Sequence, residues 1–116
     1  MTEDEFRRGT QHLEGSDDLD YVDELASEII STLRTKNPEY GESWRKRGGQ
    51  GAFFTAVRKF DRIEHAAAQC GYDVFAAFDK FQGKEGFEDT VKDTVGYLLL
   101  WLAHHRRIKA CTGKPK

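Results

Sequence analysis

The sequence has few of the features that mark secreted and membrane proteins. Its only two cysteines, Cys70 and Cys111, form neither a C-x-x-C pair nor the framework of a small disulfide-rich domain. The longest apolar run covers residues 95–103, far short of the roughly 20 residues that cross a bilayer. The N-terminal stretch is acidic and lacks the basic and apolar regions of a signal peptide. These absences argue against a membrane partner and predict a reducing, cytoplasmic location.

Strand patterns and internal repeats are also absent, and the charge is unevenly distributed. Residues 1–32 carry ten acidic side chains against two basic ones, whereas residues 33–65 carry eight basic side chains against four acidic ones. A general nucleic-acid-binding domain shows a basic stripe and a high pI, and this chain has a net charge of −2. The composition therefore argues against nucleic acid as a partner, but the basic middle suits a small phosphate-bearing ligand.

At 116 residues the chain fits one domain with a single core. Apolar residues recur at helical spacing and predict an all-α fold with helices at residues 18–35, 52–69, 72–81 and 87–108. Outside the domain, which we place at residues 17–109, we expect a flexible acidic arm at 1–16 and a loose basic tail at 110–116.

The boundaries of these helices follow from local signals. Asn37-Pro38 is expected to end the first helix, because proline lacks an N–H group and disfavours helix in the residue before it. The glycine-rich stretch 39–51 is expected to be irregular, and Gly71 is expected to close the second helix as its C′ residue.

The segment 94–103 is apolar nearly all round the helix. A helix of this kind has to be covered on more than one side. We therefore expect a homo-oligomer, a dimer or a tetramer, built on this segment around Tyr97, Leu98 and Trp101.

Two pairs of carboxylates are candidates for a metal site. Asp61 and Glu64 are three residues apart on the second helix, and Asp89 and Asp93 are four apart on the last, so each pair projects from one face. Helical projection places Glu64 inside the apolar arc of its helix. Oxygen ligands of this kind suit Mg²⁺, which is often shared with substrate phosphates. The alternative is that the acids form ordinary salt bridges with neighbouring arginines.

Basic and aromatic side chains close to these acids are candidates for holding a nucleotide. The candidates for phosphate binding are Arg58, Lys59, Arg62, Lys36 and Arg45. Tyr40 and Trp44 are candidates for stacking on a base. The alternative for each basic side chain is ordinary solvated surface.

Three segments together resemble a known family. KNPEYGESW at 36–44, RKFDRIEH at 58–65 and EDTVKDTVGYLLLWLA at 88–103 resemble the nucleotide modification associated domain 1 family, small proteins frequent in phage genomes. The last segment is also similar to a helix of the MazG-like all-α NTP pyrophosphohydrolases, which bind Mg²⁺ through E-x-x-E and E-x-x-D motifs. The resemblance implies a MazG-like helical bundle, and a place in the host cytoplasm if a phage encodes the protein. It matches Asp61-x-x-Glu64 to the first motif and Asp93 to the end of the second.

The match departs from the family pattern at two positions. The first acid is Asp61 instead of glutamate, and the acid before Asp93 is Asp89 at i−4, while Thr90 occupies i−3. The leading hypothesis is an Mg²⁺-dependent nucleotide-processing protein, related to NTP pyrophosphohydrolases and acting on (d)NTPs or modified nucleotides. The displaced acid keeps two alternatives open: a non-catalytic nucleotide-binding protein of a sequestering or regulatory kind, and a helical interaction module.

Overall fold

The computed structural model describes residues 17–40, 43–84 and 86–112, with the side chains of 37–40 and 43 left out. The described residues form helices and no strand, which confirms the all-α prediction. The elements are α2 (Asp18–Tyr40), the 3-10 helix η1 (Ser43–Arg45), α3 (Gly48–Ala68), α4 (Val74–Lys80) and α5 (Phe87–Thr112). The predicted arm at 1–16 and the end of the predicted tail, 113–116, lie outside the described residues.

Helix α2 is longer than the sequence predicted. It begins at Asp18. The backbone N–H of Asp17 donates a hydrogen bond to the Asp20 carboxylate, and the backbone N–H of Asp20 donates one to the Asp17 carboxylate. The helix then continues through Pro38 to Tyr40, so the prediction that Asn37-Pro38 ends the helix was wrong. Pro38 removes the hydrogen bond that a residue there would donate to the carbonyl of Arg34, but only two helical residues follow it, so the effect is confined to the last turn.

Helix α3 also begins earlier than expected, and the stretch predicted to be irregular is largely helical. The helix starts at Gly48, whose φ of 72° is available to glycine without strain. Gly49 and Gly51 then belong to its first turns. Its C-terminal end lies one residue before the predicted one: Gln69 is the C-cap, so Gly71, with a φ of 62°, lies one position beyond the C′ place that was predicted for it.

The last two helices have clear start signals. The Asp73 carboxylate caps α4 by accepting hydrogen bonds from the N–H groups of Phe75 and Ala76. Helix α5 has Glu88 and Asp89 in its first turn, where acids complement the helix dipole. It runs to Thr112, three residues into the stretch predicted as a tail.

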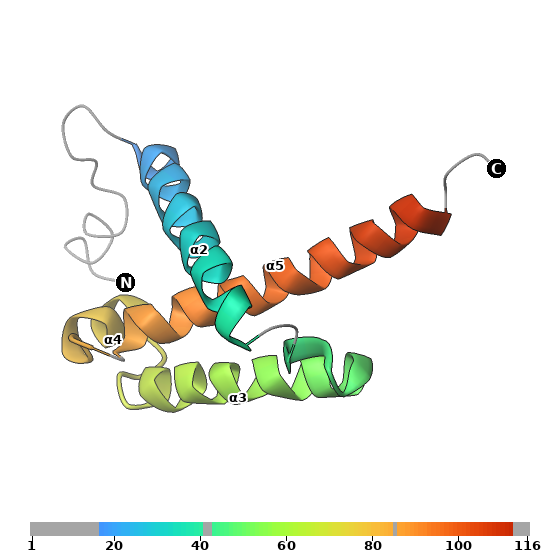
Figure 1. Ribbon diagram of the computed structural model, residues 1–116. Coiled ribbons are helices and arrows are strands. Elements are labelled where there is room, and N and C mark those ends of the chain that lie inside the picture. Colours follow the sequence, from blue (N-terminus) through green and yellow to red (C-terminus); the bar gives the residue numbers. More distant parts are fainter. Residues whose placement is uncertain (1–16, 41–42, 85, 113–116) are drawn as a thin grey trace.

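The helices form an open arrangement around α5 (Figure 1). Helix α3 runs alongside α5 in the opposite direction, α4 lies at one end of the pair, and α2 crosses α5 near its middle. Gly96 is buried at this crossing, where a Cβ atom built on it would lie 3.4 Å from Leu33 Cδ2 and 3.9 Å from Ile29 Cγ2. The absence of a side chain at Gly96 thus allows α2 to approach closely.

The core of the described residues is small and built mainly from alanine. Its buried apolar members are Ile29, Ala52, Ala56, Ala67, Ala77 and Phe87. No large side chain among them is fully buried, and sixteen large apolar side chains are exposed. One chain therefore leaves much of its apolar surface uncovered.

Candidate functional site: an aromatic and basic pocket

The four predicted metal ligands lie on α3 and α5. Asp61 and Glu64 are exposed on α3, and Asp89 is exposed in the first turn of α5. Asp93 is half-buried, and its Oδ2 accepts a hydrogen bond from Lys59 Nζ at 3.3 Å. Of the four, Asp93 is thus engaged by a lysine of the neighbouring helix.

Glu64 is exposed because α3 packs through the alanine-rich edge of its apolar arc and not through the arc's centre. Ala52, Ala56 and Ala67 are buried on α3, whereas Phe60, four residues before Glu64, is 55% exposed. Small alanines let the two helices approach more closely than phenylalanines would. Glu64 consequently does not point into an apolar interior.

The four predicted metal ligands do not gather into one group within the described residues. No group of three or more His, Cys, Asp or Glu side chains that could hold a metal ion occurs there. The Lys59 ammonium group lies 3.3 Å from Asp93 Oδ2, where it competes with any cation for this carboxylate. Mg²⁺ binding therefore stays a prediction from the sequence.

The predicted phosphate-binding residues are spread over several surfaces. Lys36, Arg58 and Arg62 are exposed, and Lys59 pairs with Asp93. Arg45 lines a cavity.

That cavity, of about 360 Å³, lies between η1, the start of α3 and the second half of α5. The residues that line it are Trp44, Arg45, Gly48, Gly49, Ala52, Phe53, Trp101 and His104. Its size is within the range of small-ligand sites. We call it the Trp44–Trp101 pocket.

One wall of the pocket joins an aromatic ring, a guanidinium group and an imidazole. The Arg45 guanidinium lies over the Trp44 ring, 4.5 Å from its centroid, in a cation–π contact. Arg45 Nη1 is 2.9 Å from His104 Nδ1. Because a guanidinium can only donate, this nitrogen of His104 accepts the hydrogen bond. The Trp44 and His104 rings also meet edge to face, with their centroids 6.1 Å apart.

The other wall is aromatic and contains a hydrogen-bond donor that the described residues do not satisfy. The Phe53 and Trp101 rings are stacked, with centroids 6.4 Å apart and planes 22° apart. The buried Nε1 of Trp101 has no hydrogen-bond partner among the described residues. A buried donor without a partner destabilises the fold, and because this nitrogen is covered by protein atoms it is not a contact point for a ligand in the pocket as folded here.

The local sequence explains why the pocket is open. Gly48 and Gly49 place no side chain between η1 and α5. Helix α3 begins there without a side-chain cap on its first N–H groups, which leaves a helix N-terminus facing the cavity as a potential anion site.

Sequence reasoning identified part of this pocket. Trp44 and Arg45 were predicted as ligand-binding residues, whereas Trp101 was assigned to an oligomer core and His104 was not proposed as a binding residue. The spacing of Trp101 and His104, three residues apart on one helix face, was the signal that could have connected them. The side chain of Tyr40, the other predicted stacking residue, lies outside the described residues.

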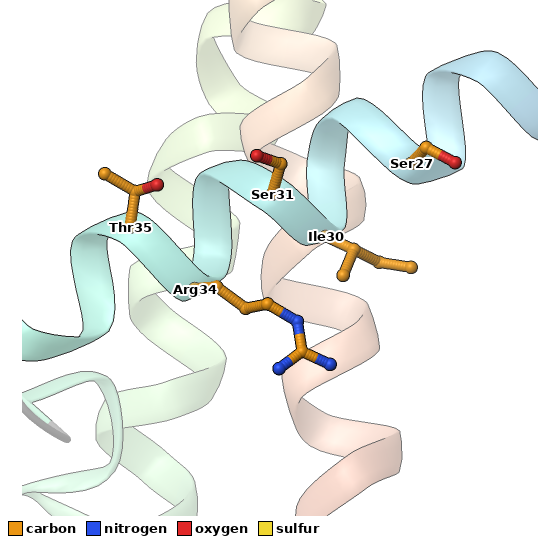
Figure 2. Close-up of a pocket in the computed structure, with 5 residues that line it drawn as sticks. All are labelled: Ser27, Ile30, Ser31, Arg34 and Thr35. Carbon is orange, nitrogen blue, oxygen red and sulfur yellow. The ribbon is translucent and has the colours of Figure 1, made fainter.

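A second hollow lies along α2 and is lined by Ser27, Ile30, Ser31, Arg34 and Thr35. Figure 2 shows that all five side chains come from this one helix, with Ser31 and Thr35 pointing away from Arg34. The polar groups do not converge on a common point, so the hollow lacks the arrangement of a binding site.

Comparisons with known proteins do not identify the chain. No family model matches it, and neither the curated proteins nor the solved structures contain a match. Within its described part, no helix is long and apolar enough to span a membrane.

Proposed function

We propose that the protein binds a nucleotide, or a closely related phosphate carrying an aromatic ring, in the Trp44–Trp101 pocket. The observation that carries this proposal is the convergence of two tryptophans, one phenylalanine and one arginine on a single cavity. Aromatic rings provide stacking surfaces for a base, and arginine is suited to phosphate oxygens.

The two ends of such a ligand would contact different parts of the pocket. The base would lie against Trp44 or the stacked Phe53 and Trp101. The phosphate would lie beside Arg45 and the first N–H groups of α3, where the helix dipole favours negative charge. Arg45 would then exchange its contact with His104 for contacts with phosphate oxygens.

The contact between Lys59 and Asp93 supports binding without turnover over hydrolysis. The sequence resemblance supports a nucleotide as the ligand, in a MazG-like bundle that acts as a homo-oligomer. Mg²⁺-dependent pyrophosphate release remains a prediction that can be measured on the same samples.

Intrinsic fluorescence tests the proposal directly, because the only two tryptophans of the chain, Trp44 and Trp101, both line the pocket. Titration with ATP, dATP, nucleoside monophosphates and inorganic phosphate, each with and without Mg²⁺, should give saturable quenching by the nucleotides. Saturation by inorganic phosphate with the same affinity would show that the base is not recognised. No saturable change with any nucleotide would overturn the proposal.

A matched pair of arginine variants locates the site. Arg45→Ala removes the guanidinium from the pocket and should weaken nucleotide binding about 10- to 100-fold, the value of a hydrogen bond to a charged group. Arg62→Ala removes an exposed arginine of α3 and should leave the affinity unchanged. Calorimetry measures both, with circular dichroism to verify the fold. Equal affinities for Arg45→Ala and the natural chain would place the ligand elsewhere.

A further inference from the structure

Helix α5 has one face that neither α2, α3 nor α4 covers. Its contacts with α2 are at Gly96 and Lys92, and Asp93 and Trp101 face α3. Phe87 contacts Phe78 of α4. The remaining arc holds Val95, Leu98, Leu99 and Leu102, whose side chains are between 38% and 64% exposed.

This arc has the sequence period of a helix-pairing surface. A seven-residue spacing connects four positions of this helix, Glu88, Val95, Leu102 and Lys109. Two further apolar residues, Val91 and Leu98, lie four residues before Val95 and Leu102. Apolar residues at alternating steps of four and three along a helix form the seam through which two helices pack. We call the seam from Glu88 to Lys109 the α5 stripe.

The charges at the two ends of the α5 stripe are opposite. Glu88 and Asp89 are in the first turn, whereas Arg106, Arg107 and Lys109 follow the apolar segment, and no acidic residue occurs after Asp93. A parallel pair of α5 helices would bring like charges together, but an antiparallel pair would bring opposite charges together at both ends.

From this pattern we propose that a second copy of the chain covers the α5 stripe, in an antiparallel pair with two-fold symmetry. With the axis between Leu98 and Leu99, Val95 lies opposite Leu102 of the second copy, and Glu88 lies opposite Lys109 of the second copy. A symmetric interface uses the same surface on both chains, so the single stripe suffices. The C-terminal turns of α5 extend away from the other helices (Figure 1), which leaves room for the second chain.

This interface is separate from the Trp44–Trp101 pocket, which lies on the α3 side of α5. The dimer would cover apolar residues that a single chain leaves exposed, in agreement with the small core of the described residues. Failure of either proposal would leave the other intact, since ligand binding and chain mass are measured separately.

Sedimentation equilibrium of the full chain should give twice the chain mass of 13.3 kDa. Leu102→Glu should abolish association because it places a charge in the middle of the stripe. Phe75→Glu, on the exposed surface of α4, should not affect it. A folded chain that stays monomeric at every concentration would overturn the proposal.

Charge reversal tests the antiparallel arrangement without altering any apolar residue. Glu88→Lys and Lys109→Glu should each weaken the dimer about tenfold, because each creates two like-charge contacts per dimer. Asp89→Lys and Arg107→Glu are matched controls from the same turns on another side of the helix, and should change the affinity much less.

Mixing the two weakened variants is the decisive measurement. In a heterodimer of Glu88→Lys with Lys109→Glu, both end contacts again join opposite charges, so the mixture should associate about as tightly as the natural chain. The chain carrying both substitutions should also recover its affinity. If neither combination recovers, or if the single variants dimerise normally, the proposed antiparallel pair is wrong.

Discussion

Lys92 is the residue through which α2 and α5 are joined electrostatically. Its Nζ lies 3.0 Å from Glu28 Oε1 on α2 and 3.0 Å from Glu88 Oε2 on its own helix. Hydrogen bonds to Glu88 and to Glu28 raise the pKa of Lys92 above its ordinary value, against a smaller opposing effect of burial. The folded chain thus holds this proton more tightly than the unfolded chain does.

This contact predicts a small, pH-dependent contribution to stability. Glu28→Gln should lower the free energy of unfolding by about 0.2–1 kcal/mol at neutral pH, as for a solvent-accessible ion pair. A raised native pKa means that the contribution is complete below the ordinary lysine pKa and disappears as the pH rises through the native value. Urea unfolding at neutral and at strongly alkaline pH measures the difference.

Glu24→Gln provides the control, because Glu24 is one turn away on α2 and makes no ion pair with any described residue. It should change stability less than Glu28→Gln does at neutral pH. An effect of Glu28→Gln that persisted at alkaline pH would have a cause other than Lys92.

At the level of single residues, two of the predicted ligand-binding side chains line one pocket, whereas the predicted metal ligands do not gather into one group of described residues. Trp44 and Arg45 could be found because an aromatic and a basic side chain are adjacent in the chain. Glu64 could not be placed correctly, because helical projection gives the apolar arc and not the face that packs on a neighbour. The pairing of Lys59 with Asp93 depends on how α3 and α5 align, which no local pattern specifies.

Among the elements, α2 crosses α5 at Gly96, where the space beside Leu33 and Ile29 is about that of one methyl group. A Cβ atom there would come into ordinary contact with Leu33 and Ile29. Gly96→Ala should therefore raise the free energy of unfolding by about 0.5–1 kcal/mol, since alanine lowers the backbone entropy of the unfolded chain and improves helix propensity. Gly96→Val should instead lower it by about 1–3 kcal/mol, because its branches would push Leu33 away.

Denaturant midpoints of the two variants test this packing. Ala103→Gly, at an exposed position of the same helix, measures the intrinsic alanine-to-glycine difference for comparison. If Gly96→Ala and Gly96→Val were equally stable, Leu33 and Ile29 of α2 would not be in close steric contact with position 96.

The sequence predicted the number and order of the four main helices, but not all their boundaries. Apolar periodicity is a local and strong signal, so α4 and the start of α5 agree with expectation. Pro38 and the glycines at 48–51 were interpreted as breaks, although a proline followed by only two helical residues and glycines in the first turns leave the rest of a helix intact. The error in both cases came from applying rules for the middle of a helix to its ends.

At the scale of the whole molecule, the folded chain has more apolar surface than its own helices cover. The buried set is mostly alanine, while leucines and phenylalanines remain exposed on several helices. The sequence predicted uncovered apolar surface at residues 94–103, because a helix that is apolar nearly all round has to be covered on more than one side. The sequence could not identify the face of α5 on which a second chain would pack. That face follows from the contacts of α5 with α2 and α3.

If a second copy covers the α5 stripe, the apparent thermal stability should depend on protein concentration, because unfolding then includes dissociation. From the usual unfolding entropy of a domain of this length, each tenfold increase in concentration should raise the melting temperature on the order of 3 °C. Leu102→Glu should melt at one temperature at all concentrations, since its transition involves a single chain. Circular dichroism over a wide dilution series gives the comparison, and an unchanged melting temperature of the natural chain would mean that one chain alone sustains the fold.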